Sequence, residues 1–213
     1  MLRFNVYRDG SLAEHIDLSG AYLFGQDGIP VRAELAGAKG QISCKKRSPG
    51  ACGLSLLWDA GAPGRLMLGT SRLPDQGAPY NLNVELARAA VMRLIRKRED
   101  WGLFDYEEAA PLNERLGRVQ GRFVDALTAE TPEQAARAAD EALSEAVTLG
   151  ERMALFHADI FLRRRRQSPA GSRLSFGCVA DLLSVTQRYR QRLLEAFDFV
   201  SIPMSWKRLA PKE

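Results

Sequence analysis

The sequence has few of the residues from which common catalytic and metal sites are built. Only 2 histidines and 3 cysteines occur among its 213 residues. The cysteines (Cys44, Cys52 and Cys178) have no regular spacing, so they predict neither a disulfide framework nor a metal-ligand set. His157 lies two residues from Asp159 in a stretch expected to be helical, where such positions point to different sides. We therefore expect a partly buried or surface histidine there, no His–Asp catalytic pair, and no metal or cofactor.

Long apolar runs are also absent. No segment approaches the roughly 18 apolar residues of a transmembrane helix. The N-terminus reaches polar residues by Asn5 and has no apolar signal-peptide region. Gly61–Gly64 lacks the following Lys-Ser/Thr of a phosphate-binding loop and is typical of a hairpin turn. We expect no membrane partner, and a cytoplasmic location.

Short β-prone runs separated by Gly and Pro turns fill the first 80 residues. Residues 2–7 alternate, with Leu2, Phe4 and Val6 on one face, which predicts a strand. Asp9-Gly10 is a turn signal. Further strands are expected over residues 21–24, 29–35, 41–45, 53–58 and 65–70. This pattern favours a small β-sandwich over residues 1–80.

From Asn81 the spacing of apolar residues becomes helical. Asn81 or Asn83 can cap the first helix, and a second helix is expected at about residues 106–127. Thr131-Pro132 opens a third helix, because threonine caps and proline suits the first helical position. That helix can extend to Arg163–Arg166. We interpret residues 81–167 as a helical connector.

The last segment predicts a strand, a helix and a strand over residues 173–178, 182–197 and 199–204. This is the size of a βαβ unit, because parallel strands need such a crossover. The face of its helix that we expect to be buried contains Val185, Tyr189, Leu193, Leu194 and Phe197. The predicted fold class is α+β, with domains at residues 1–80, 81–167 and 168–213.

Two features suggest ligands, and each has a structural alternative. Arg163–Arg166 could bind phosphate backbones. However, no aromatic residue interleaves with the run and an acidic stretch precedes it, so we favour a solvated or acid-facing helix end and expect no nucleic-acid partner. Trp58 and Tyr80 could form a stacking platform for a sugar, or pack in the core or an interface.

Residues 174–211 carry an ordered set of residues that resembles the opening of the glycoside hydrolase family 10 barrel, whose members are mainly endo-β-1,4-xylanases. Phe176, Gly177 and Val179 resemble its first strand. Residues 79–88 with Glu99–Trp101 resemble the end of a β-rich leading region in some members, which we take as carbohydrate-binding-like on fold analogy. The second element is matched by Phe197, Val200, Met204, Trp206, Leu209 and Pro211.

The resemblance implies an incomplete (β/α) barrel start of one βαβ unit, because a whole barrel takes roughly 250 residues. It implies the N-terminal part of a retaining hydrolase that acts on a β-1,4-linked polysaccharide such as xylan. The family's two catalytic glutamates lie on the fourth and seventh strands, beyond this chain. We therefore assign no catalytic residue, and expect the 213-residue chain alone to be inactive. The alternative is a non-catalytic scaffold that binds carbohydrate or protein.

The chain departs from the family at three positions that hydrogen-bond the sugar there. Ile202-Pro203 replaces the family's Asn-Glu, and Ser205 replaces its Lys. These changes imply an altered sugar contact or a divergent branch. Asp181, at the end of the first strand, is interpreted as a cap of the next helix. The expected carbohydrate-binding residues are Trp206, Ser205, Trp58 and Tyr80.

Overall fold

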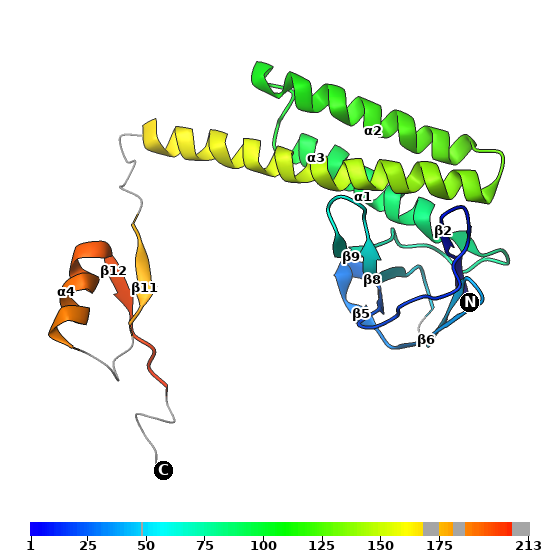
Figure 1. Cartoon of the computed structure of the whole chain (residues 1–213), viewed down its shortest axis with the longest axis horizontal. Helices are drawn as coiled ribbons and strands as arrows, with labels where there is room; N and C mark the ends of the chain where they lie inside the picture. Colours follow the sequence, from blue (N-terminus) through cyan, green and yellow to red (C-terminus); the bar gives the residue numbers. More distant parts are fainter. Residues whose placement is uncertain (48, 168–174, 181–185, 206–213) are drawn as a thin grey trace, which may run out of the picture. The chain divides into compact units, whose positions relative to one another are not determined.

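The computed structural model of the chain describes residues 1–47, 49–167, 175–180 and 186–205. It consists of two compact units, Met1–Ala158 and Asp159–Glu213, which are treated separately below. The fold is a mixture of helices and several sheets, and the described ranges contain no closed barrel (Figure 1). The α+β class predicted from the sequence is thus confirmed at this level.

The strands of the first unit form two four-stranded sheets and a short hairpin. One sheet has the order β10-β1-β7-β6, in which β1 pairs parallel with β10 and antiparallel with β7. Its strands are β1 (Leu2–Asn5), β6 (Ala33–Ala38), β7 (Gln41–Lys46) and β10 (Tyr80–Asn81). The second sheet is antiparallel and contains β4 (Tyr22–Phe24), β5 (Pro30–Val31), β8 (Gly53–Asp59) and β9 (Arg65–Gly69). The hairpin is β2 (Tyr7–Arg8) with β3 (Ser11–Leu12).

The prediction of a single strand over residues 29–35 is wrong. Residues there form β5 in one sheet and β6 in the other, and Arg32 lies between them. β5 is an edge strand, where Pro30 is tolerated because its missing N–H removes no inner ladder bond. The chain changes sheets at a point where its residue pattern shows no turn signal.

Three helices complete the first unit, and they begin close to the predicted positions. They are α1 (Leu82–Asp100), α2 (Ala110–Thr128, preceded by the 3₁₀ turn η2, Glu107–Ala109) and α3 (Pro132–Gln167), whose last residues belong to the second unit. Asn81, one of two predicted caps, accepts the Val84 N–H at 3.4 Å. Within the described ranges, no helix has both the length and the apolarity needed to cross a bilayer.

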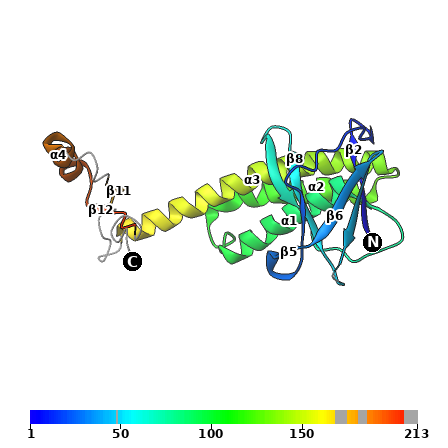
Figure 2. The same cartoon turned by 90° about the horizontal axis from the view of Figure 1, so that it is seen from below.

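One hydrophobic core joins the sheets to these helices. Leu2, Phe4 and Leu56 of the strands are essentially inaccessible, as are Leu86 and Leu143 of the helices. Figures 1 and 2 show α1 and the first part of α3 lying alongside the sheets. The change from strands to helices near residue 80 therefore does not interrupt the core.

The second unit contains the predicted strand, helix and strand. They are β11 (Gly177–Val179), α4 (Gln187–Ala196) and β12 (Phe199–Ser201). β11 and β12 pair in parallel, with Gly177 opposite Phe199. α4 begins after the Thr186 cap, whose hydroxyl accepts the Tyr189 N–H at 3.1 Å. Residues 182–185 of the predicted helix, including Val185, lie outside the described residues.

The predicted burial of the α4 apolar face is wrong. Leu194 is 76% exposed and Phe197 is 37% exposed, while Tyr189 and Leu193 are only partly covered. The physical reason is that two short strands form too small a sheet to cover one helix face.

Candidate functional site

A polar pocket of about 440 Å³ lies in the first unit, where β2, the end of β8 and the first third of α3 meet. The predicted Asp9-Gly10 turn follows β2, and both residues adopt positive φ (50° and 79°), which suits a tight hairpin. On the other side, Asp59 closes a turn by accepting the Gly61 N–H at 3.0 Å. The pocket is lined by Tyr7, Arg8, Asp9, Trp58, Asp59, Ala60, Gly61, Asp140, Glu141 and Ser144.

Asn83 connects β2 to α3 beside the pocket. Its side chain is fully buried on α1. Its Oδ1 accepts the Tyr7 N–H at 3.1 Å, and its Nδ2 donates to the Tyr7 carbonyl at 3.0 Å. The same Nδ2 donates to both carboxylate oxygens of Asp140, at 3.0 and 2.9 Å. The amide thus uses its donors and its acceptor within the protein, and orients Asp140.

Asp140 is a carboxylate with a perturbed proton affinity. Burial raises the pKa of Asp140 to about 6; the Asn83 hydrogen bond and the Arg8 charge lower it, and the Asp59 and Asp9 charges raise it. Its carboxylate is therefore mostly ionised at pH 7. A partly buried carboxylate held in one orientation can accept hydrogen bonds from hydroxyl groups of a ligand.

Arg8 and Trp58 form the opposite side of the pocket. The Arg8 guanidinium lies 5.4 Å from the centroid of the Trp58 ring, within cation–π range. Trp58 itself is only 4% exposed, as the packing alternative expects. The pocket therefore offers one guanidinium donor and several carboxylate acceptors (Asp9, Asp59 and Glu141 are exposed) rather than an open aromatic face.

The structure describes three of the four residues expected to bind carbohydrate. Trp58 lines the polar pocket, but Tyr80 lies in the other sheet, where its hydroxyl donates to the Pro74 carbonyl at 3.0 Å. Ser205 is exposed in the second unit, and Trp206 lies outside the described residues, as does Asp181. Trp58 and Tyr80 do not share the pocket.

The other candidate residues are packed, ion-paired or buried. His157 is partly buried on α3 and stacks on Trp101, with 4.7 Å between ring centroids, which confirms the interpretation of a helix histidine. Asp159 pairs with Arg163 at 3.0 Å. Burial raises the pKa of the Cys44 thiol to about 12, so it is not a nucleophile near neutral pH.

Sequence reasoning missed Asn83 as a buried anchor, and missed Arg8 and Asp140 altogether. A signal for Asp140 was present: it lies four residues after Ala136 and three before Leu143, both buried, so it borders the buried face of α3. Tyr7 and Asn83, by contrast, are 76 residues apart, and no local pattern links them.

Comparisons with protein-family models, with curated proteins and with solved structures give no match to this chain.

Proposed function

We propose that this chain is the N-terminal part of a glycoside hydrolase, similar to family 10, that acts on a β-1,4-linked polysaccharide such as xylan. The observation that carries the proposal is the parallel pairing of β11 with β12 across α4. A strand, a crossover helix and a parallel strand are the repeating unit of a (β/α)₈ barrel. They occur where the motif residues resemble the family's first two strands.

Local contacts of this unit support the proposal. A Cβ atom on Gly177 would lie 2.3 Å from the Phe199 ring, so a side chain at position 177 would require this ring to move. The Phe176 N–H donates to Asp198 Oδ2 at 3.0 Å, and the Asp198 N–H donates to the Phe176 carbonyl at 2.8 Å. The two hydrogen bonds hold the start of β11 beside the start of β12.

Exposed apolar side chains around the same strands also support it. Strands of a parallel barrel are covered on both faces. Here the exposed residues include Phe176, Val179, Phe199, Val200, Ile202 and Met204. Further strands and helices of a barrel would cover such surfaces.

In this proposal the catalytic carboxylates lie beyond residue 213, and the two units described here are non-catalytic. Retaining hydrolysis needs a nucleophile and an acid/base carboxylate about 5–5.5 Å apart. The test is the release of reducing sugar from xylan by the full-length gene product and by residues 1–213. We expect release by the first and none by the second. Turnover by residues 1–213, or none by the full-length product on any β-1,4-glucan or xylan, would overturn the proposal.

The polar pocket favours a second role, the binding of a carbohydrate by the first unit. The observation behind it is the Asp140 carboxylate, oriented by Asn83 and faced by Arg8, in one pocket. Calorimetry of residues 1–213 with xylohexaose tests this role. We expect Asp140→Asn to reduce affinity about tenfold or more, because one charged acceptor is lost.

The matched control is Asp125→Asn, which removes an exposed carboxylate on α2 outside the pocket. It should leave the affinity unchanged. No heat of binding for the unsubstituted chain, or equal losses in both variants, would rule out a sugar site at the pocket.

A further inference from the structure

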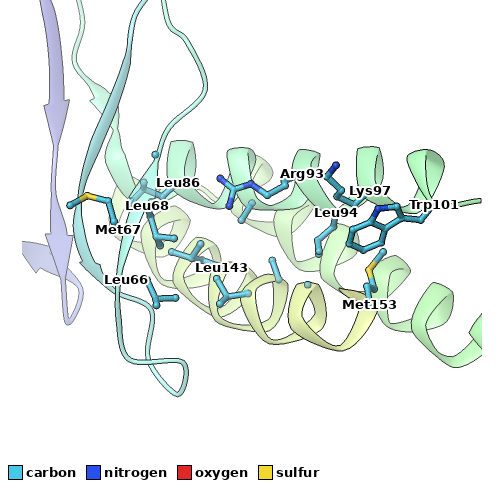
Figure 3. A pocket seen from close by; sticks show the side chains of 15 residues that line it. Leu66, Met67, Leu68, Leu86, Arg93, Leu94, Lys97, Trp101, Leu143 and Met153 are labelled. Atoms are coloured by element: carbon cyan, nitrogen blue, oxygen red, sulfur yellow. The ribbon is translucent and has the colours of Figure 1, made fainter. Parts of the chain in front are cut away.

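A second cavity, of about 460 Å³, lies between β9, α1 and α3 of the first unit. Figure 3 shows its aliphatic walls, to which all three elements contribute. They include Leu66 and Leu68 of β9, Leu86 and Leu94 of α1, and Leu143 and Met153 of α3. Cavities of this size with mostly apolar linings are typical of small-molecule sites.

Small residues keep this space open. Ala90 on α1 and Ala146 and Gly150 on α3 are among the residues that line the cavity. A Cβ atom on Gly150 would lie 3.2 Å from Leu94 Cδ2, so the two helices approach closely there. Larger side chains at these positions would fill the cavity, as they do in a close-packed core.

The charges at the cavity have one sign. Among the described residues, the charged ones that line it are Arg93 and Lys97, four residues apart on the same face of α1. Lys97 pairs with Asp100 at 3.0 Å and lies 5.6 Å from the Trp101 ring. The exposed Arg93 guanidinium has no hydrogen bond or ion pair to any residue that the structure describes. An apolar ligand with one anionic end would pack against the aliphatic walls and pair with the Arg93 guanidinium.

We propose that this cavity binds an amphiphilic monocarboxylate, of the class of medium-chain fatty acids. The aliphatic tail lies between β9, α1 and α3, and the carboxylate accepts hydrogen bonds from Arg93. A neutral amphiphile leaves the Arg93 guanidinium unused, and a cationic one is repelled by both charges. This inference is independent of the proposed hydrolase function.

The test is calorimetry of residues 1–213 with three ligands that share a tail: decanoate, decanol and decyltrimethylammonium, each below its micelle-forming concentration. We expect decanoate to bind more tightly than decanol by roughly tenfold or more, the factor given by a hydrogen bond to a charged group. Decyltrimethylammonium should bind more weakly than decanol. Equal affinities for all three ligands, or no binding of decanoate, would overturn the proposal.

Three variants, one of them a control, locate the ligand. Arg93→Gln should reduce the affinity for decanoate to that for decanol, whereas Arg96→Gln, an exposed arginine on the same helix outside the lining, should have no effect. Ala90→Leu should remove binding of both ligands while the circular dichroism spectrum is kept. Equal effects of the two arginine variants would overturn the proposal. A dimer in size-exclusion chromatography that takes up no decanoate would also overturn it, and would indicate a second copy of the chain as the occupant.

Discussion

Asn83 is the residue on which the polar pocket depends. Its buried amide makes hydrogen bonds to the Tyr7 backbone on one side and to the Asp140 carboxylate on the other. A buried polar group is costly when a partner is removed, because the remaining donors and acceptors lose water without replacement. The residue therefore links the hairpin strand β2 to α1 and α3 energetically as well as geometrically.

We predict that Asn83→Ala lowers the free energy of unfolding by about 2–4 kcal/mol, because the buried Tyr7 N–H and carbonyl and the partly buried Asp140 carboxylate lose their partner. Urea denaturation followed by circular dichroism measures this loss. The comparison is Asn113→Ala, which removes one hydrogen bond to the Leu103 carbonyl and should cost about 1 kcal/mol. Equal losses would contradict the role of Asn83 as an anchor.

The raised pKa of Asp140 predicts that the free energy of unfolding depends on pH. Its pKa rises from 3.8 to about 6 on folding, so the folded chain binds more protons than the unfolded chain between these values. Its contribution to stability is complete below about pH 4 and is lost as the pH rises through 6. Asp140→Asn removes the loss, so the variant should be more stable than the original chain at pH 7, by at most about 3 kcal/mol, and equally stable at pH 4.

Urea denaturation at pH 4 and pH 7 tests this prediction, with Asp125→Asn as the control expected to change neither value. A variant that is less stable at pH 7 than the original chain would show that the charged form of Asp140 is required for folding. The predicted gain in stability together with a loss of sugar affinity would mark a carboxylate that is kept for binding.

At the scale of elements, Asn81 connects two helices. It caps α1 through the Val84 N–H, and its Nδ2 donates to the Pro132 carbonyl at the start of α3 at 3.0 Å. Asn81→Ala should cost about 1–2 kcal/mol because it removes both bonds. Asn81→Asp keeps an acceptor for the cap and loses the donor, so it should cost less. Thermal or urea unfolding separates the two variants, and equal costs would mean that the cap contributes nothing.

Helix starts were predictable because their signals are local. Asn81 and Thr131-Pro132 lie at the beginning of α1 and α3, and the Thr131 hydroxyl accepts the Gln134 N–H at 3.3 Å. α2 begins a few residues after the predicted Tyr106, because the chain first makes the turn η2.

Pairing between distant segments was not predictable. The parallel contact of β1 with β10 joins Phe4 to Tyr80, and the Tyr7–Asn83 bonds join the same two regions. Alternation of apolar residues identifies a strand and its buried face, but it does not identify its neighbour. For the same reason, Trp58 could be selected from the sequence as a candidate whereas the side chains around it could not.

At the scale of the whole molecule, the strands and helices of the first unit share one core. Buried residues run from Leu2 in β1 to Met153 in α3 without a break in the cluster. We therefore predict that residues 1–80 do not fold by themselves, because removal of the helices exposes the apolar sheet surfaces packed against them. The measurement is the urea unfolding of residues 1–80 and of residues 1–167. A cooperative transition for the shorter fragment would contradict a shared core.

The configuration of the sugar that is released tests the proposed hydrolase function. The proposal assigns the βαβ unit to the start of a retaining glycoside hydrolase barrel, so the full-length gene product should first release the β-anomer from a β-1,4-linked xylo-oligosaccharide. Proton NMR of the anomeric signals during the first minutes distinguishes the two anomers before they equilibrate. We expect initial release of the β-anomer, and release of the α-anomer or of no product would rule out a retaining hydrolase.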